Sequence, residues 1–269
     1  MTETHELTRG TTPLLVSFPH VGTEIPDDIA QRLTPVALQR ADTDWHLPLL
    51  YNFARELGAS TLVAHFSRFV IDLNRPPGDA SLYPGRDTTG LVPIDTFHKE
   101  SLYQGALPAA AEIAARRERY WRPYHVALAT EIERLQSEHG VAVLWDAHSI
   151  ASVLPRFFDG KLPDLNLGTA DGASCSPQLQ SVVESTLRSQ SAYTWVANGR
   201  FTGGYITRRY GQPTKAVHAL QMEMCQCTYM DESAPFALRE DLADGVRPIL
   251  RALLDTVLRW AKSTGARHA

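Results

Sequence analysis

Residues 141–149 read VAVLWDAHS, an apolar run that ends in the polar side chains of Asp146 and His148. A continuous apolar run of about four to eight residues, bounded by polar or turn-forming residues, is typical of a strand buried on both faces. Residues 12–22, TPLLVSFPHVG, have the same organisation and place His20 after the apolar run. Each run therefore predicts a buried strand that delivers a histidine to the loop at its carboxyl end.

The rest of the chain alternates between strand-like and helix-like segments. Further strands are predicted at residues 60–64, 68–73, 194–197 and 216–224. Helices are predicted at residues 27–33, 35–53, 107–140, 177–190 and 241–262, the third of them interrupted near Arg122 and Pro123. Short buried strands that alternate with helices predict an α/β fold, a three-layer sandwich around a mostly parallel or mixed central sheet.

Composition and charge narrow the class of protein. The chain has 269 residues, of which 43% are hydrophobic and 21% charged, as is ordinary for a globular protein. A net charge of −4 without a long basic run argues against binding to nucleic acid. No apolar stretch reaches the roughly 18 residues of a membrane span, and the N-terminus is not organised like a signal peptide. We expect one domain over residues 1–269, located in the cytoplasm, with no membrane partner.

The cysteines do not indicate a structural framework. They are Cys175, Cys225 and Cys227, and an odd number does not favour a set of disulfides. The pair Cys225-Gln226-Cys227 is short and isolated for a zinc site. We expect these residues to be small buried thiols on a strand.

Polar residues that follow the predicted strands indicate one functional site. In open α/β sheets, ligands bind outside the carboxyl ends of the strands, where His20 and His148 are expected. Two histidines from separate strands and one carboxylate would complete a catalytic zinc site with an open position. Spacing leaves three candidates for the carboxylate: Glu24, Asp42 and Asp44. The alternative for Asp42 and Asp44 is capping of the N-terminus of a helix.

A carboxylate and several arginines could complete the chemistry of this site. Glu223 interrupts an apolar strand, so it is either paired with an arginine or a general base whose pKa is raised by burial. Arginine matches a carboxylate in two hydrogen bonds, and the candidates for binding an anionic substrate are Arg75, Arg208 and Arg209. Gly203 and Gly204, before Tyr205, allow close approach of the backbone.

Six phrases occur in a fixed order along the chain: SFPHVGTEIP, ADTDWHLPLLY, FVIDLNRPP, LWDAHS, GGYITRRYG and ALQMEMCQCTYMDE. Together they resemble the N-formylglutamate amidohydrolase family over about residues 12–255, whose members act last in one bacterial route of histidine degradation. The phrase at residues 72–75 also looks like one in the aspartoacylases, zinc enzymes of the wider carboxypeptidase-like group. The resemblance implies a zinc-exopeptidase-like (phosphorylase/hydrolase-like) sandwich and a metal-dependent amidohydrolase that cleaves N-formyl-L-glutamate to formate and L-glutamate.

The resemblance also implies roles for individual residues. Zinc, or another divalent metal, would be held by His20, Asp44 and His148. Glu24 is the reserve ligand, because Thr23 stands where the carboxypeptidase-like pattern has its glutamate. Glu223 would be the catalytic base. The small-molecule substrate, an N-formyl amino acid, would be bound by Asn74, Arg75, Gly204, Tyr205 and Arg208.

Three other functions use some of the same residues. A deacylase or carboxypeptidase that acts on another N-acyl acidic amino acid would need the same ligands and base. A binding module for carboxylates would keep the arginines without the metal. A serine hydrolase would use Ser149, but the chain lacks the Gly-x-Ser-x-Gly turn that presents such a nucleophile.

Overall fold

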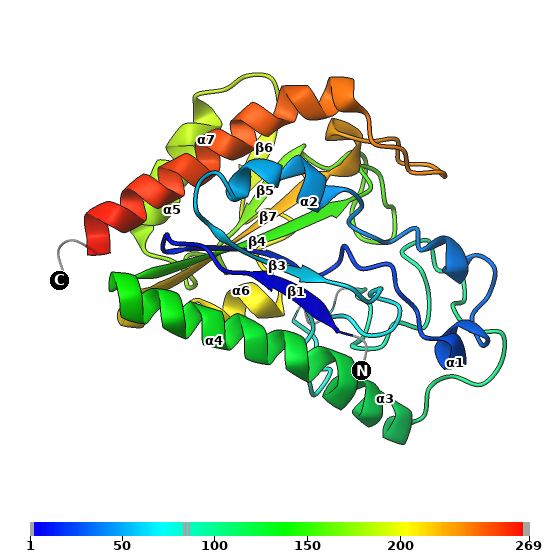
Figure 1. Cartoon of the computed structure of the whole chain (residues 1–269). Coiled ribbons are helices and arrows are strands. Elements are labelled where there is room, and N and C mark those ends of the chain that lie inside the picture. The colour runs from blue at the N-terminus through cyan, green and yellow to red at the C-terminus, as the bar shows by residue number, and fades with distance from the viewer. Residues whose placement is uncertain (1–2, 83–84, 86, 266–269) are drawn as a thin grey trace.

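A seven-stranded mixed sheet forms the centre of the molecule, with helices on both of its faces (Figure 1). The computed structural model describes residues 3–82, 85 and 87–265. The strands are β1 (His5–Thr8), β2 (Leu14–Phe18), β3 (Ser60–Ala64), β4 (Ala142–Ile150), β5 (Leu165–Gly168), β6 (Trp195–Ala197) and β7 (Val217–Cys225). Their order across the sheet is β1-β3-β2-β4-β7-β5-β6. The central strands β3, β2, β4 and β7 are parallel, whereas β1 and β5 run antiparallel to their inner neighbours. The predicted three-layer α/β fold is confirmed.

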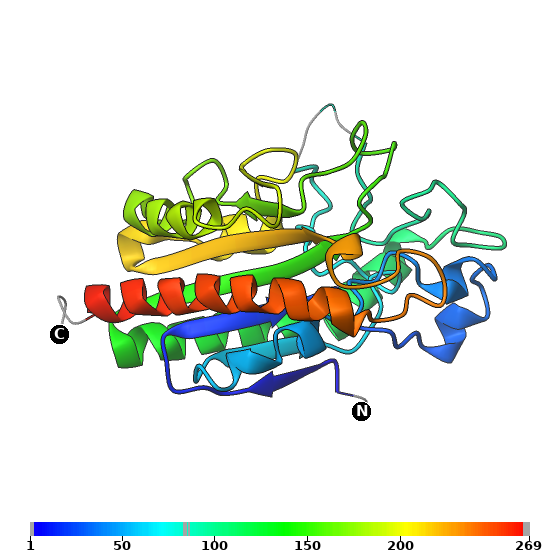
Figure 2. The ribbon, with the colours of Figure 1, turned by 90° about the horizontal axis from the view of Figure 1, so that it is seen from above.

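The helices divide between the two outer layers. They are α1 (Asp27–Ala30), α2 (Leu47–Leu50), α3 (Ala110–Arg116), α4 (Arg122–His139), α5 (Pro177–Arg188), α6 (Tyr205–Tyr210) and α7 (Glu240–Gly265). One layer contains α2, α5 and α7, and the other contains α3, α4 and α6 (Figure 1). Figure 2 looks onto the first layer and shows α7 lying lengthwise over the strands. Within the described part of the chain, no helix combines the length and apolar character needed to span a membrane.

The alternation of side chains along β4 shows how each layer is held to the sheet. Val143, Trp145 and Ala147 belong to the apolar cluster under α7, and Ala142 and Leu144 belong to the cluster under α4. All five side chains are buried. Successive side chains of a strand point to opposite faces, so a strand covered on both faces must be apolar at every position until it reaches a site. This explains why residues 141–145 form an uninterrupted apolar run.

Several elements differ from the prediction. The segment 68–73 forms turns instead of a strand, which brings Arg68 to an ion pair with Asp72 at 2.8 Å. Residues 35–53 contain only short helical turns, at Ala37–Gln39, α2 and Asn52–Ala54, and the helix predicted at 27–33 is the short α1. Strands β1 and β5 and helix α6 were not predicted. The long helix at 107–140 is interrupted, by a π-helical turn at Arg117–Trp121 that leads directly into α4.

Strand β4 is longer than predicted, and this moves a histidine. The prediction placed His148 in a loop, but β4 continues to Ile150. Parallel β7 extends equally far and pairs with β4 up to Ile150 and Cys225, so the backbone of the polar residues stays in the ladder. His148 therefore lies on the sheet itself, in register with Glu223.

Candidate active site

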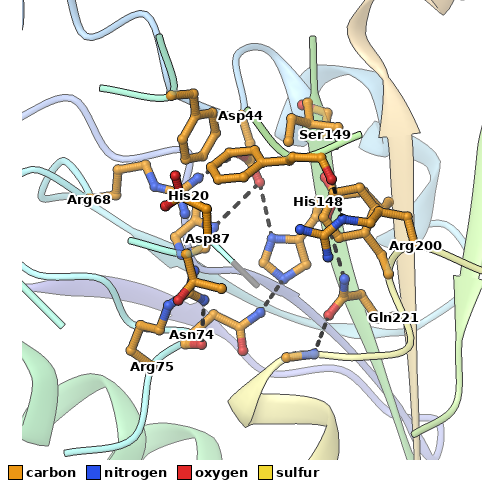
Figure 3. Close-up of a pocket in the computed structure, with 17 residues that line it drawn as sticks. His20, Asp44, Arg68, Asn74, Arg75, Asp87, His148, Ser149, Arg200 and Gln221 are labelled. Carbon is orange, nitrogen blue, oxygen red and sulfur yellow. Dashed lines mark hydrogen bonds and ion pairs between the residues drawn. The ribbon is translucent and has the colours of Figure 1, made fainter. Parts of the chain in front are cut away.

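Two histidines and an aspartate converge at the carboxyl ends of the central strands. Nδ1 of His148 lies 3.1 Å from Oδ2 of Asp44, and Nδ1 of His20 lies 3.7 Å from the same oxygen (Figure 3). One ligand atom from each residue lies within 4.8 Å of the other two, and all three side chains are buried. Two imidazole nitrogens and a carboxylate oxygen form a donor set that fits a catalytic zinc ion. The arrangement could hold a metal ion.

The outer nitrogens of both imidazole rings are held by further carboxylates. Nε2 of His20 lies 2.7 Å from Oδ1 of Asp72, and Nε2 of His148 lies 3.0 Å from Oδ2 of Asp146. Each contact leaves Nδ1 directed toward Asp44. Metal-binding histidines usually donate their other ring N–H to such a partner, which fixes the tautomer and the orientation of the ring. The two carboxylates thus hold both rings with Nδ1 toward Asp44.

The register between β4 and β7 brings the polar side chains of the site together. Asp146 pairs with Gln221, and His148 pairs with Glu223. The four residues alternate with the apolar positions that face α7, so their side chains project toward the layer of α4 and α6. On that face Oδ1 of Asp146 accepts a hydrogen bond from Ser17 at 3.0 Å. Two neighbouring strands therefore place His148 and Glu223 side by side on one face by alternation alone.

The structure separates the three candidates for the acidic ligand. Asp44 faces the histidines, and its backbone N–H donates to the carbonyl of His20 at 3.0 Å. Asp42 accepts a hydrogen bond from the backbone N–H of Phe97 at 2.9 Å and caps no helix. Glu24 is exposed, and its backbone pairs with the segment at 65–67. The N-cap interpretation is therefore wrong, and Glu24 lies outside the group formed by His20, Asp44 and His148, because a long-range loop contact and not local spacing places Asp44 there.

Glu223 lines the same cavity as the two histidines and Asp44. Burial raises the pKa of Glu223 to about 8. Its carboxylate accepts a hydrogen bond from the side-chain amide of Gln221 at 3.3 Å, and Oε1 of Gln221 accepts one from the backbone N–H of Gly204 at 2.7 Å. A buried carboxylate beside a cavity, with a raised pKa, is a common feature of a general acid or base.

Three arginines line the cavity, and they are not the predicted set. Arg75 is one of the three, as predicted, and the others are Arg68 and Arg200. The side chain of Arg208 is exposed, donates to Gly203 and Thr202, and does not line the cavity. Its place in α6 turns it outward, because the adjacent Ile206 and Thr207 are the buried residues of this short helix. The prediction for Arg208 is therefore not supported.

The other predicted substrate residues also divide between the cavity and its support. Asn74 and Gly204 line the cavity. Oδ1 of Asn74 accepts from the backbone N–H of Ile206 at 2.8 Å, and its Nδ2 lies 3.1 Å from Nε2 of His148. A Cβ atom on Gly204 would lie 2.2 Å from Nδ2 of Asn74, so only glycine fits there. Tyr205 does not line the cavity. Its ring packs beside Trp121 and His125, which makes it part of the layer of α4 and α6.

Comparisons with known proteins identify the family of the chain. The model of the family described as N-formylglutamate amidohydrolase matches residues 12–230. The chain belongs to this family. It is 51% identical to an N-formylglutamate deformylase of Pseudomonas aeruginosa over 97% of this chain and 98% of that protein. It is 50% identical to an N-formylglutamate deformylase of Pseudomonas putida over 94% of both chains. The crystal structure of N-formylglutamate amidohydrolase from Ralstonia eutropha JMP134 matches with a TM-score of 0.80 at 28% identity, over 99% of both chains.

In this amidohydrolase, the sequence analysis assigned no role to three charged residues at or beside the cavity: Arg68, Asp72 and Arg200. Asp72 was quoted within a motif but was given no role, and Arg68 and Arg200 were not considered. A signal existed for Asp72 and Arg68: they are four residues apart and flank an apolar stretch. Burial of that stretch would also bury both charges, and buried charges are usually paired. No local pattern marks Arg200, which reaches the cavity from the loop between β6 and α6.

Proposed function

We propose that the chain is a metal-dependent N-formylglutamate deformylase that hydrolyses N-formyl-L-glutamate to formate and L-glutamate. The single observation that carries the proposal is the convergence of His20, Asp44 and His148 beside Glu223 in one cavity. Membership of the amidohydrolase family and the names of relatives that match nearly the whole chain support the choice of substrate.

His20, Asp44 and His148 would hold the metal ion, for which zinc is our proposal. The donor set fits zinc because it contains two imidazoles and one carboxylate, and each imidazole is oriented by a second carboxylate. When bound there, zinc would act as a Lewis acid on the formyl group and lower the pKa of water toward about 7.

Glu223 is the proposed general base and acid. It would accept a proton from the attacking water and return it to the nitrogen of the leaving glutamate, so that the amide bond breaks without release of a charged amine anion. The positive charge of an ion held by the three ligands would favour the ionised form of Glu223, whereas burial favours the neutral form. The hydrogen bond from Gln221 holds the carboxylate toward the cavity.

Arg75 and Arg200 are the proposed contacts for the two carboxylates of the substrate. Arg75 is positioned by bonds to the carbonyl and hydroxyl of Thr89, and Arg200 by a bond from its Nε to the carbonyl of Phe157 at 2.6 Å. Figure 3 shows the two residues on opposite sides of His148. Arg68 is engaged by Asp72 at 2.8 Å and by Asp44 at 3.8 Å, so its charge serves these two carboxylates first.

Formate release from N-formyl-L-glutamate tests this function. The protein is stripped of metal with a chelator, assayed, and assayed again after one equivalent of zinc is returned, with N-acetyl-L-aspartate as the competing substrate. We expect no formate from the stripped protein, recovery with zinc, and little release of acetate from N-acetyl-L-aspartate. Chelator-resistant release of formate would overturn the metal-dependent mechanism, and preferred cleavage of N-acetyl-L-aspartate would make the chain a deacylase of another class.

A further inference from the structure

A second group of metal-ligand side chains lies outside the cavity, at the carboxyl end of β7. One ligand atom from each of Asp164, Cys225 and Cys227 lies within 4.8 Å of the other two. Asp164 and Cys225 are buried, and Cys227 is partly buried. None of the three lines the cavity that contains His148 and Glu223. From local patterns these cysteines were predicted only to be buried thiols, because Asp164 lies far from Cys225 and Cys227 along the chain.

The sheet brings the three residues together. Cys225 is the last residue of β7, and its backbone N–H donates to the carbonyl of Asp164 at 2.9 Å. Asp164 directly precedes β5, which runs antiparallel to β7. Cys227 lies in the 3₁₀ turn Gln226–Thr228 that follows β7, and its backbone N–H donates to Glu232 at 2.9 Å. Hydrogen bonds of backbone groups therefore hold all three residues in place.

The carboxylate of Asp164 is oriented with one oxygen toward a removable partner. Oδ2 accepts from the backbone N–H of Thr194 at 2.9 Å and from its hydroxyl at 2.7 Å. Oδ1 accepts from Nζ of Lys161 at 2.9 Å, and the lysine side chain is 56% exposed. A cation at Oδ1 would replace the ammonium group, which can move into solvent without loss of a buried contact.

The surroundings favour a positive ion. The carbonyl oxygens of Leu162 and Pro163 each lie 3.4 Å from Sγ of Cys225. Glu232 supplies a further negative charge beside Cys227, and Lys161 is the cation that the ion would displace. Two sulfurs and a carboxylate oxygen form a softer donor set than that of the first site, one that suits zinc and rejects magnesium or calcium.

We propose that Asp164, Cys225 and Cys227 form a second metal site that binds zinc or a similar thiophilic divalent ion. The ion would join the end of β7, the strand that carries Glu223, to the start of β5. Binding releases the thiol protons to solvent and involves no change of oxidation state. The site does not depend on the proposed deformylase reaction.

Cobalt titration of the reduced, metal-stripped full-length chain tests the proposal. A thiolate bound to Co²⁺ gives a charge-transfer absorption in the near ultraviolet, and the site of His20, Asp44 and His148 contains no sulfur. We expect the band in the native chain, with saturation at one sulfur-bound cobalt per chain, and again in a His148→Ala variant. Cys227→Ser, at a partly buried position, should weaken the cobalt affinity read from this band by more than the roughly 10–100-fold cost of a lost outer-shell partner.

Cys175→Ser is the matched control, because Cys175 is a buried thiol in the core under α7. This variant should keep the band and its midpoint. A circular dichroism spectrum and an unfolding midpoint like those of the metal-stripped native chain show that Cys227→Ser is folded. The absence of the band in the reduced native chain, an unchanged band in Cys227→Ser, or a disulfide between Cys225 and Cys227 that persists under reduction would each overturn the second site.

Discussion

The two faces of the central sheet are built from the same strands but have opposite character. On the face under α7, the inward residues of β4 and β7 are buried and almost all apolar: Val143, Trp145, Ala147, Leu220, Met222 and Met224. On the face under α4 and α6, the same strands change from apolar to polar along their length, in the orders Ala142, Leu144, Asp146, His148 and Val217, Ala219, Gln221, Glu223. One face stabilises the fold, and the other carries a site at its carboxyl end.

The difference shows how a buried site is tolerated by a sheet. Charged side chains are seldom buried without partners, and here Asp146 and His148 satisfy each other, while Asp72 satisfies His20. The apolar face meets no such demand and supplies the burial that offsets the cost. Substitutions on the two faces should therefore separate turnover from stability.

The largest expected effect is on turnover, for Glu223→Gln. The amide keeps the shape and the hydrogen bond to Gln221 but cannot accept a proton, so kcat for formate release should fall by roughly 10²–10⁴-fold. Binding of N-formyl-L-glutamate, measured by calorimetry, should persist. A variant that retains kcat within about tenfold would exclude Glu223 as the base.

Leu220→Ala should have the opposite effect, on stability alone. Leu220 is fully buried on the face under α7, and a truncation to alanine in a core of this kind costs about 2–5 kcal/mol of unfolding free energy. The kcat of the folded fraction should stay within about twofold. Denaturant unfolding measures the change, and Val126→Ala, at an exposed position of α4, should change stability by less than about 0.5 kcal/mol.

Arg200→Ala tests the loop that completes the polar face. Loss of a hydrogen-bonded charge pair with the substrate costs about 1.5–3 kcal/mol, so kcat/KM should fall by roughly 10–150-fold, chiefly through KM. Arg208→Ala is the matched control, because its side chain is exposed and does not line the cavity. Equal losses in the two variants would mean that the assignment of Arg200 is wrong.

The smallest expected effect is on the pH dependence of stability. It concerns His218, a titratable residue of β7 on the apolar face under α7. Burial lowers its pKa to about 4, and Nδ1 accepts from the backbone N–H of Ser176 at 3.1 Å. Because the pKa is lower in the folded chain than the ordinary 6.5, the unfolded chain binds the proton first. Stability from this group is complete above pH 6.5 and is lost as the pH falls toward 4, by at most about 1.4 kcal/mol per pH unit.

His218→Asn keeps an acceptor near the position of Nδ1 and removes the titration. Unfolding free energy, measured between pH 7 and 4 on metal-stripped protein, should therefore decline less in the variant than in the native chain. The same decline in both would assign the acid sensitivity to other groups.

The alternation of apolar runs and helical segments was enough to predict the α/β fold and the two strands that precede the histidines. It failed for residues 68–73, where apolar residues indicate a strand but the charges of Arg68 and Asp72 must turn inward to meet. It also failed at the end of β4, because only the pairing with β7 keeps His148 in the ladder. Local patterns indicate which residues are buried. They indicate strand pairing only where the buried residues also lie in a strand.

Sequence by itself determined that each of two histidines follows a buried apolar run and that a carboxylate interrupts a third run, because apolar periodicity and polar interruptions are local properties of the chain. The tertiary structure decided which side chains lie together. Asp44 and not Glu24 lies beside the histidines, and Arg200 and not Arg208 lines the cavity. Asp164 lies beside the two cysteines. Each choice depends on a contact between segments that only the order and register of the sheet bring together, and no spacing along the chain encodes that order.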